Sequence, residues 1–143
     1  MKLLEKLVKM MNREDLIKEA VKARENSYSP YSNFKVGAAL LCKDGTVFHG
    51  ANIENSSYGL CMCAERNALY NAMNHGYKKD DFVSLVVLAD TEGPCSPCGA
   101  CRQVMHELLP VSADIILANM KGEFKVTNTN ELLPFAFGSE DLK

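Results

Sequence analysis

The sequence predicts one α/β domain with a three-layer α/β/α architecture, in which helices cover both faces of a mixed five-stranded sheet. Three observations lead to this fold class. An Asp-Gly turn at Asp44 and Gly45 joins two apolar segments into a hairpin. The run from Leu85 to Leu88 is continuously apolar, as in a strand that is covered on both faces. Segments with helical periodicity alternate with the later strands, and 143 residues are enough for one compact core.

The first half of the chain is predicted to form a helix and then a hairpin. Asn12 is suited to cap the helix, because Glu14 and Asp15 follow in its first turn and apolar residues then repeat at helical spacing. Pro30 marks a loop before the first strand. The predicted elements are a helix over residues 12–26, a loop over 27–33, and strands over 34–42 and 47–51.

The second half is predicted to alternate between helices and strands. Gly76 and Pro110 are typical of residues at or just beyond helix ends. Asn130 is predicted to cap a short helical turn before Pro134. The predicted elements are a loop over residues 52–60, a helix over 63–74, a strand over 82–89, a loop over 93–99, a helix over 99–109, and strands over 115–118 and 124–127.

Composition and charge exclude several classes of function. The net charge is -2 and the pI is about 5.9, so the chain lacks the basic stripe of a nucleic-acid-binding protein. No apolar run approaches the ~18 residues of a membrane span. Residues 1–11 are amphipathic, and their charges interrupt any secretory segment. We therefore expect a cytoplasmic protein with an N-terminal extension over 1–11, one catalytic domain over 12–143, and no nucleic-acid or membrane partner.

Five of the six cysteines lie at or near two predicted helix starts, which indicates a metal site. Cys61 and Cys63 precede the first of these helices, and Cys95, Cys98 and Cys101 surround the start of the second. Helix N-termini favour thiolate over thiol, and cysteines at i and i+3 point in the same direction. Three or four such sulfurs suit zinc, and a catalytic site keeps one of its four positions open.

Two registers of Pro-Cys-x-x-Cys fit the second half of this motif. The register with Cys98 and Cys101 is favoured, because a good amphipathic helix begins at Gly99, whereas the register with Cys95 and Cys98 lies in a proline-containing loop. Cys61 and Cys95 are then bystanders near the site. A closed structural site with four thiolate ligands is the alternative reading. The remaining cysteine, Cys42, lies in an apolar run and is predicted to be a small buried hydrophobic residue.

Glu65 follows Cys63 by two residues, and a glutamate beside an open zinc position can take and return protons. This Cys-x-Glu step before Pro-Cys-x-x-Cys resembles the signature of nucleobase deaminases. Further motifs resemble the small homotetrameric cytidine deaminases from about Met11 to the tail: residues 34–40, 52–55, 63–66, 97–103 and 132–137. The resemblance implies a cytidine deaminase-like fold and hydrolytic deamination of free cytidine and deoxycytidine by zinc-activated hydroxide, as in pyrimidine salvage.

The resemblance also assigns roles to individual residues. It implies one zinc ion per subunit held by Cys63, Cys98 and Cys101, with Glu65 as the proton shuttle. Substrate contacts would come from Asn52 and Glu54 on the ribose, Phe34 and the backbone of Ala64 on the base, and Tyr58 and Phe137 in a neighbouring subunit's pocket. Three thiolates and one Zn²⁺ leave one net negative charge, so Arg66 has a physical reason to donate to the thiolates.

Three other functions remain open from the sequence. An enzyme of the same fold could act on a blasticidin-type drug, although the Asn52 and Glu54 pair favours a nucleoside. A deaminase of polynucleotides is disfavoured by the negative net charge. A zinc-stabilised scaffold without activity would need a fourth protein ligand.

Overall fold

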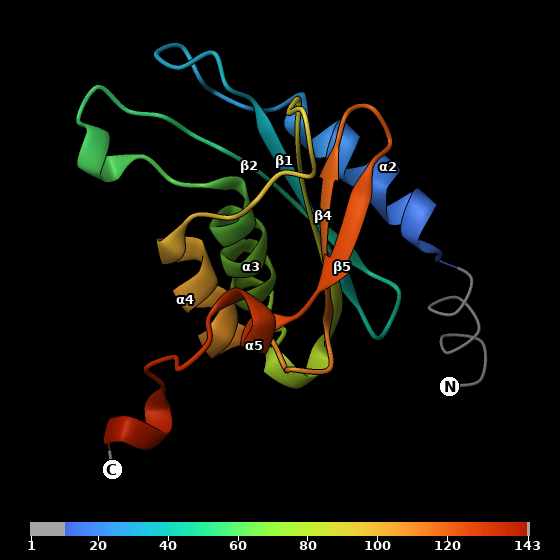
Figure 1. Ribbon diagram of the computed structural model, residues 1–143, viewed down its shortest axis with the longest axis vertical. Coiled ribbons are helices and arrows are strands. Elements are labelled where there is room, and N and C mark those ends of the chain that lie inside the picture. The colour runs from blue at the N-terminus through green and yellow to red at the C-terminus, as the bar shows by residue number, and fades with distance from the viewer. Residues whose placement is uncertain (1–10, 143) are drawn as a thin grey trace.

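The computed structural model describes residues 11–142, which form a five-stranded sheet flanked by helices (Figure 1). The strand order is β2-β1-β3-β4-β5. The strands are β1 (Val36–Cys42), β2 (Val47–Ala51), β3 (Phe82–Ala89), β4 (Asp114–Asn119) and β5 (Phe124–Thr127). Strands β3 and β4 are parallel, and the other neighbouring pairs are antiparallel. The mixed sheet confirms the predicted fold class, whereas residues 1–10 of the predicted extension lie outside the described residues.

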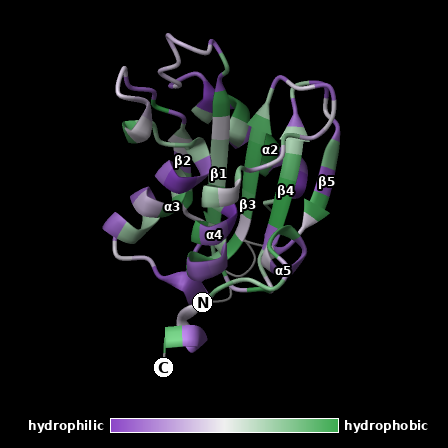
Figure 2. Ribbon diagram, turned by 60° about the vertical axis from the view of Figure 1, so that its left-hand side comes forward, coloured by the Kyte–Doolittle hydropathy of each residue, from purple (hydrophilic) through white to green (hydrophobic). Residues whose placement is uncertain are grey.

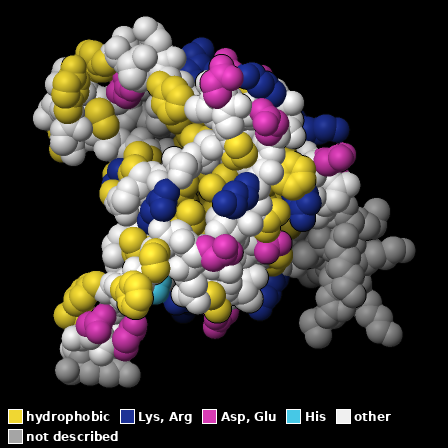
Figure 3. All heavy atoms as spheres, viewed as in Figure 1, with side chains coloured by type: hydrophobic (Ala, Val, Ile, Leu, Met, Phe, Trp, Pro, Cys, Tyr) yellow, Lys and Arg dark blue, Asp and Glu magenta, His cyan; other side chains and the backbone are white. Residues whose placement is uncertain are grey.

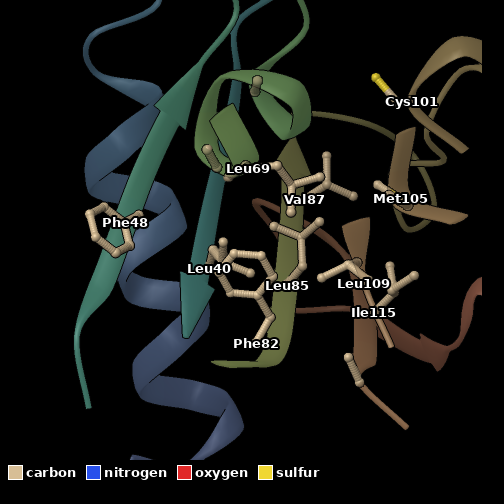
Figure 4. Close-up of a cluster of buried hydrophobic side chains, with 14 of the residues drawn as sticks. Leu40, Phe48, Leu69, Phe82, Leu85, Val87, Cys101, Met105, Leu109 and Ile115 are labelled. Atoms are coloured by element: carbon tan, nitrogen blue, oxygen red, sulfur yellow. The ribbon is translucent and has the colours of Figure 1, made fainter. Parts of the chain in front are cut away.

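Helices cover both faces of the sheet, as Figure 2 shows. Helix α2 packs on one face through Leu16 and Ala20, which join a cluster with Val86 and Leu88 of β3. Helices α3 and α4 pack on the other face, where the larger cluster includes side chains from β1, β3 and β4 (Figure 4). The helices are α2 (Arg13–Arg24), α3 (Ala64–Asn74), α4 (Gly99–Leu108) and the short α5 (Thr129–Leu132). Within residues 11–142, no helix has the length and hydrophobicity needed to span a bilayer.

Strand β3 supplies both hydrophobic clusters, which explains its continuous apolar run. Leu85 and Val87 face the α3 and α4 side, while Val86 and Leu88 face α2. A strand at the centre of a three-layer domain is covered on both faces, so its side chains are apolar apart from the buried Ser84. Cys42 at the end of β1 is fully buried as predicted, and burial raises the pKa of its thiol to about 12.

The caps and strand ends agree with the sequence in most places, but the cap of α5 and the start of β1 differ, and β4 is one residue longer at each end than predicted. Asn12 caps α2, since its side-chain oxygen accepts from the backbone N–H of Asp15 at 2.8 Å. The predicted cap at Asn130 is wrong, because Asn128 has the extended backbone of an N-cap and accepts from the N–H of Glu131. Strand β1 begins two residues later than predicted, at Val36, and the carbonyls of Phe34 and Lys35 before it accept from the side chains of Asn52 and Arg24.

The sheet topology places the starts of α3 and α4 at the same end of the molecule. Strands β2 and β3 are both antiparallel to β1, so they run in the same direction. The segment after β2 leads into α3, and the segment after β3 leads into α4. Loops that follow strands of the same direction leave the sheet at the same end, so their residues come close together. The two cysteine-bearing helix starts therefore meet.

Gly50 allows α3 to approach β2 closely, and its replacement by alanine is expected to destabilise the fold. A Cβ at Gly50 would lie 2.3 Å from the carbonyl oxygen of Ala64 and 2.4 Å from the N–H nitrogen of Ala68. Overpacking against a rigid helix backbone costs about 1–3 kcal/mol of unfolding free energy. Urea denaturation of Gly50→Ala measures this loss. Gly93→Ala is the control, because a Cβ there meets no atom within 4 Å; equal stability of the two variants would contradict the account.

Candidate metal centre and active site

Both helices that carry the cysteines begin at a cysteine. Cys63 is the N-cap of α3 and Cys98 is the N-cap of α4, and each has an extended backbone conformation. Neither side chain caps its own helix, so both sulfurs are free to turn toward each other. Cys101 follows in the first turn of α4 and is buried. Three sulfurs from two helix starts thus converge at one place.

The spacing of these three sulfurs fits a zinc ion. The ligand atoms of Cys63, Cys98 and Cys101 all lie within 4.8 Å of one another, and the Cys63 and Cys98 sulfurs are 3.8 Å apart. Zinc–sulfur bonds of about 2.3 Å at tetrahedral angles place two thiolates about 3.8 Å apart. Among residues 11–142, no other group of three or more potential ligands meets in this way. The structure thus brings together the cysteines of the register that begins at Pro97.

The electrostatics of the cluster favour a thiolate at Cys63. A hydrogen bond from the Cys101 thiol, together with the Arg66 guanidinium, lowers the pKa of Cys63 to about 5. The same sulfur–sulfur bond raises the pKa of Cys101. Arg66 Nη2 donates to the Cys63 sulfur at 3.4 Å, and this contact raises the pKa of the guanidinium. Arg66 therefore places a positive charge against the Cys63 sulfur, as expected from the sequence.

Glu65 is a buried carboxyl group beside the sulfurs. It lies in the first turn of α3, only 4% of its surface is exposed, and it lies within hydrogen-bond reach of the Cys101 thiol. Burial raises the pKa of Glu65, since desolvation disfavours the charged form. A carboxyl group with a raised pKa is suited to both accepting and donating a proton near neutral pH.

The other two cysteines near the site stay apart from the sulfur cluster. Cys95 is buried, its N–H donates to Ala118 at 3.0 Å, and burial raises the pKa of its thiol to about 11. The Cys61 sulfur accepts from the N–H of Asn55 at 3.3 Å. Neither belongs to the group of converging ligand atoms, which disfavours a closed site with four sulfurs.

Asn52 holds the segment from Phe34 to the start of β1 through its side-chain amide. Its side-chain nitrogen donates to the Phe34 carbonyl at 2.7 Å, and its side-chain oxygen accepts from the N–H of Val36 at 2.9 Å. The hydroxyl of Ser27 also donates to this oxygen. These bonds fix the loop that carries Phe34, whose side chain remains 44% exposed.

Glu54 is also held by the loop before β1, through backbone N–H groups that lie ahead of Phe34 in the chain. One carboxylate oxygen accepts from the N–H groups of Tyr31 and Ser32 at 2.9 and 3.1 Å, and the other accepts from the Ser32 hydroxyl. The Ser32 hydroxyl is the main cause that lowers the pKa of Glu54. A carboxylate offers about four acceptor sites, so Glu54 keeps capacity for one more donor. Tyr31, Ser32, Glu54, Tyr58 and Cys61 line a hollow of about 300 Å³.

A backbone bridge connects Asn52 and Glu54 with the start of helix α3. Ile53 and Met62 exchange two N–H to carbonyl bonds, each 2.9 Å long. Ile53 lies between Asn52 and Glu54, and Met62 directly precedes Cys63. Ala64 is the first residue of α3 and fully buried, and such a position has an N–H without an acceptor inside the helix. The bridge therefore joins the segment that carries Asn52 and Glu54 to the helix start that carries Cys63 and the N–H of Ala64.

The two remaining predicted site residues point into solvent. Tyr58 is 75% exposed, and its ring meets Tyr31 edge to face at 6.1 Å. Phe137 is 58% exposed, although its carbonyl accepts from Gln103 at 2.9 Å. Figure 3, which has the same view as Figure 1, shows hydrophobic side chains gathered on the projecting loops and on the C-terminal tail. Neither ring is buried within the chain that carries it.

Two residues that contact the site were not predicted from the sequence. Ser32 contacts Glu54, and Arg102 donates to the loop that precedes Cys98. A signal for Arg102 was present, because it lies four residues after Cys98 and so one helical turn away. No comparable signal exists for Ser32, since its contact depends on how two loops meet.

Comparison with known proteins places the chain in a family. Residues 10–116 match the model of the cytidine and deoxycytidylate deaminase zinc-binding region. The chain is similar to a cytidine deaminase of Halalkalibacterium halodurans, with 55% identity over 92% of this chain and 98% of the relative. A cytidine deaminase of Sporosarcina psychrophila is 54% identical over 92% of this chain and 96% of the relative.

A solved structure gives the same result at the level of the fold. The crystal structure of a cytidine deaminase from Burkholderia pseudomallei superposes with a TM-score of 0.87 and 54% identity, and the match covers 89% of this chain and all of the other. Both cysteine-bearing helix starts lie within the residues that match the family model. The chain therefore belongs to the cytidine and deoxycytidylate deaminase family.

Proposed function

We propose that the chain hydrolyses the exocyclic amine of free cytidine and deoxycytidine, giving uridine or deoxyuridine and ammonia. The observation that carries this proposal is a buried carboxyl group, Glu65, beside three converging sulfurs with Cys63 as a thiolate. Cys63, Cys98 and Cys101 would hold one zinc ion per subunit, within a single catalytic domain over residues 12–143. The chemistry that zinc supplies in such a site is activation of water for attack near neutral pH.

The proton transfers are assigned to Glu65. Its carboxylate takes a proton from the attacking water and delivers it to ring N3, which makes C4 electrophilic. After the water oxygen has bonded to C4, Glu65 takes the second water proton from the new C4 hydroxyl and donates it to the exocyclic nitrogen, and the bond between C4 and that nitrogen breaks. Ammonia leaves, and C4 becomes a carbonyl carbon. The burial that raises the pKa of Glu65 suits both directions of transfer.

The proposed nucleoside specificity comes from Asn52 and Glu54. Glu54 retains acceptor capacity for a ribose hydroxyl, and Asn52 fixes the loop of Phe34, which would form an aromatic wall against the base. The N–H of Ala64 is a donor for a polar atom of the ring. This set favours a nucleoside over a drug of the blasticidin type.

Glu54→Gln is expected to weaken nucleoside recognition specifically. The change replaces one acceptor oxygen with a donor, and a hydrogen bond to a charged group contributes about 1.5–3 kcal/mol. The KM for cytidine should therefore rise roughly tenfold or more, with a smaller change in kcat. Steady-state kinetics with 2′,3′-dideoxycytidine provide the control, because that substrate lacks both secondary hydroxyls. An equal loss on both substrates would mean that Glu54 only supports the loop.

The exposed aromatic residues support a homotetramer whose sites are shared between subunits. Tyr58 and Phe137 lie at projecting segments with large exposed surfaces, where a neighbouring subunit's pocket could receive them. Analytical ultracentrifugation across a dilution series measures assembly and turnover together. Turnover that stays constant while the protein dissociates to monomers would contradict shared sites. As a small-nucleoside enzyme the chain would serve pyrimidine salvage in the cytoplasm.

The direct test is ultraviolet-monitored turnover of cytidine by the purified, zinc-loaded protein. Conversion of cytidine and deoxycytidine to their uridine nucleosides is expected. Preference for a blasticidin-type substrate, or for single-stranded DNA or RNA at low salt, would contradict the proposed substrate class. No turnover of any of these with zinc bound would point to a structural site instead.

A further inference from the structure

Arg102 makes three hydrogen bonds around the loop that leads to Cys98. Its Nε donates to the Pro97 carbonyl at 2.9 Å, and its Nη2 donates to the Ser96 hydroxyl at 2.7 Å. Its Nη1 donates to the carbonyl of Leu132, the last residue of α5, at 2.9 Å. The guanidinium therefore fastens the loop before one ligand cysteine to a second element of the fold.

All three acceptors of Arg102 are neutral oxygens. Among the described residues, the ion pairs involve Lys22, His49 and Lys121 as cations, and none involves Arg102. The five donors of a guanidinium have a fixed planar arrangement, so three simultaneous bonds define the positions of their acceptors. Arg102 thus acts through geometry and not through a paired charge.

The loop before Cys98 has few other attachments. Pro94 and Pro97 have no backbone N–H, and the last main-chain bond before the helix is from Cys95 to Ala118. Within residues 11–142, Ser96 and Pro97 have no hydrogen-bond partner other than Arg102. The Cys98 side chain does not cap α4. The Cys98 carbonyl accepts from the N–H of Arg102 at 3.0 Å, and the two residues before Cys98 are held by the Arg102 side chain.

We infer that Arg102 is a positioning residue, which fixes the Cys98 thiolate at the distance from Cys63 and Cys101 that zinc requires. This inference rests on the zinc centre proposed above. Removing a partner that orients a metal ligand typically costs about 10–100-fold in metal affinity. Lysine keeps the charge but has a single donor group, so it cannot hold Ser96, Pro97 and Leu132 together.

The test compares zinc affinity, measured by chelator competition, and the absorption spectrum of the Co²⁺-substituted protein. Arg102→Met is expected to bind zinc about 10–100-fold more weakly, with altered sulfur-to-cobalt charge-transfer and ligand-field bands. Arg102→Lys should restore only part of the affinity. Arg13→Met is the matched control, because Arg13 lies over the Phe124 ring at the start of α2 and contacts no part of the cluster.

Two results would overturn the inference in distinguishable ways. Wild-type affinity and an unchanged cobalt spectrum in a folded Arg102→Met protein would refute the positioning role alone. Failure of the wild-type protein to bind zinc would refute the metal centre, and the inference with it. If Arg102→Met does not fold, Ser96→Ala removes one of the three bonds, and a smaller loss of affinity in the same direction is expected. An unchanged affinity and cobalt spectrum in both Ser96→Ala and Arg102→Lys would again refute the role.

Discussion

Glu65→Gln is expected to lower the turnover of cytidine by about 10²–10⁴-fold while zinc remains bound. Glutamine has nearly the same shape as glutamate but cannot take a proton from water or return one to the substrate. Glu65 is buried beside Cys101 and is not one of the three converging ligands. Metal content and affinity should therefore stay close to those of the wild-type protein. Initial rates with equal zinc occupancy measure the effect.

The interpretation of this variant depends on separating chemistry from binding. The loss should appear in kcat, with little change in the affinity for a ground-state nucleoside, because proton transfer occurs only during the reaction. Glu19→Gln is a suitable control, since Glu19 is a glutamate of α2 that pairs with Lys22 and His49 far from the cluster. Near-normal turnover in Glu65→Gln would refute the proton-transfer role.

Cys98→Ala is expected to lose zinc and activity together, whereas Cys95→Ala should keep both. The Cys98 sulfur lies 3.8 Å from that of Cys63, and Cys95 is excluded from the group of converging sulfurs. Loss of a direct ligand should exceed the roughly 10–100-fold effect that is typical of outer partners. Zinc content after gel filtration and cytidine turnover measure the two effects.

The pair of variants also decides between the two registers of Pro-Cys-x-x-Cys. Cys95 is buried, so its replacement should cost some stability without changing the zinc stoichiometry. Thermal unfolding of the zinc-loaded proteins separates these contributions. Loss of zinc from Cys95→Ala with retention in Cys101→Ala would favour the register that begins at Pro94.

The local features of the sequence predicted most of the fold. The Asp44 and Gly45 turn, the apolar run of β3 and the two cysteine-bearing helix starts all appear where short-range chemistry places them. The spacing of the cysteines at two helix starts predicted that their sulfurs converge, and the structure supplies the reason, because β2 and β3 run in the same direction and deliver their loops to one end of the sheet.

Features that depend on the meeting of distant segments could not be predicted in this way. Asn128 and Asn130 are equally suited to cap a helix by residue type, and only the backbone conformation selects Asn128. The Ser32 contact to Glu54 and the reach of Arg102 to Leu132 join residues far apart in the chain. Their partners follow from tertiary packing, which carries no periodic pattern in the sequence.

The central claim is that zinc is held by three cysteines with one position open to water. X-ray absorption at the zinc edge of the wild-type protein tests this claim most directly. We predict three sulfur neighbours at about 2.3 Å and one oxygen or nitrogen neighbour at about 2.0 Å. Four sulfur neighbours, and no lighter atom, would mean a closed structural site and would contradict the account.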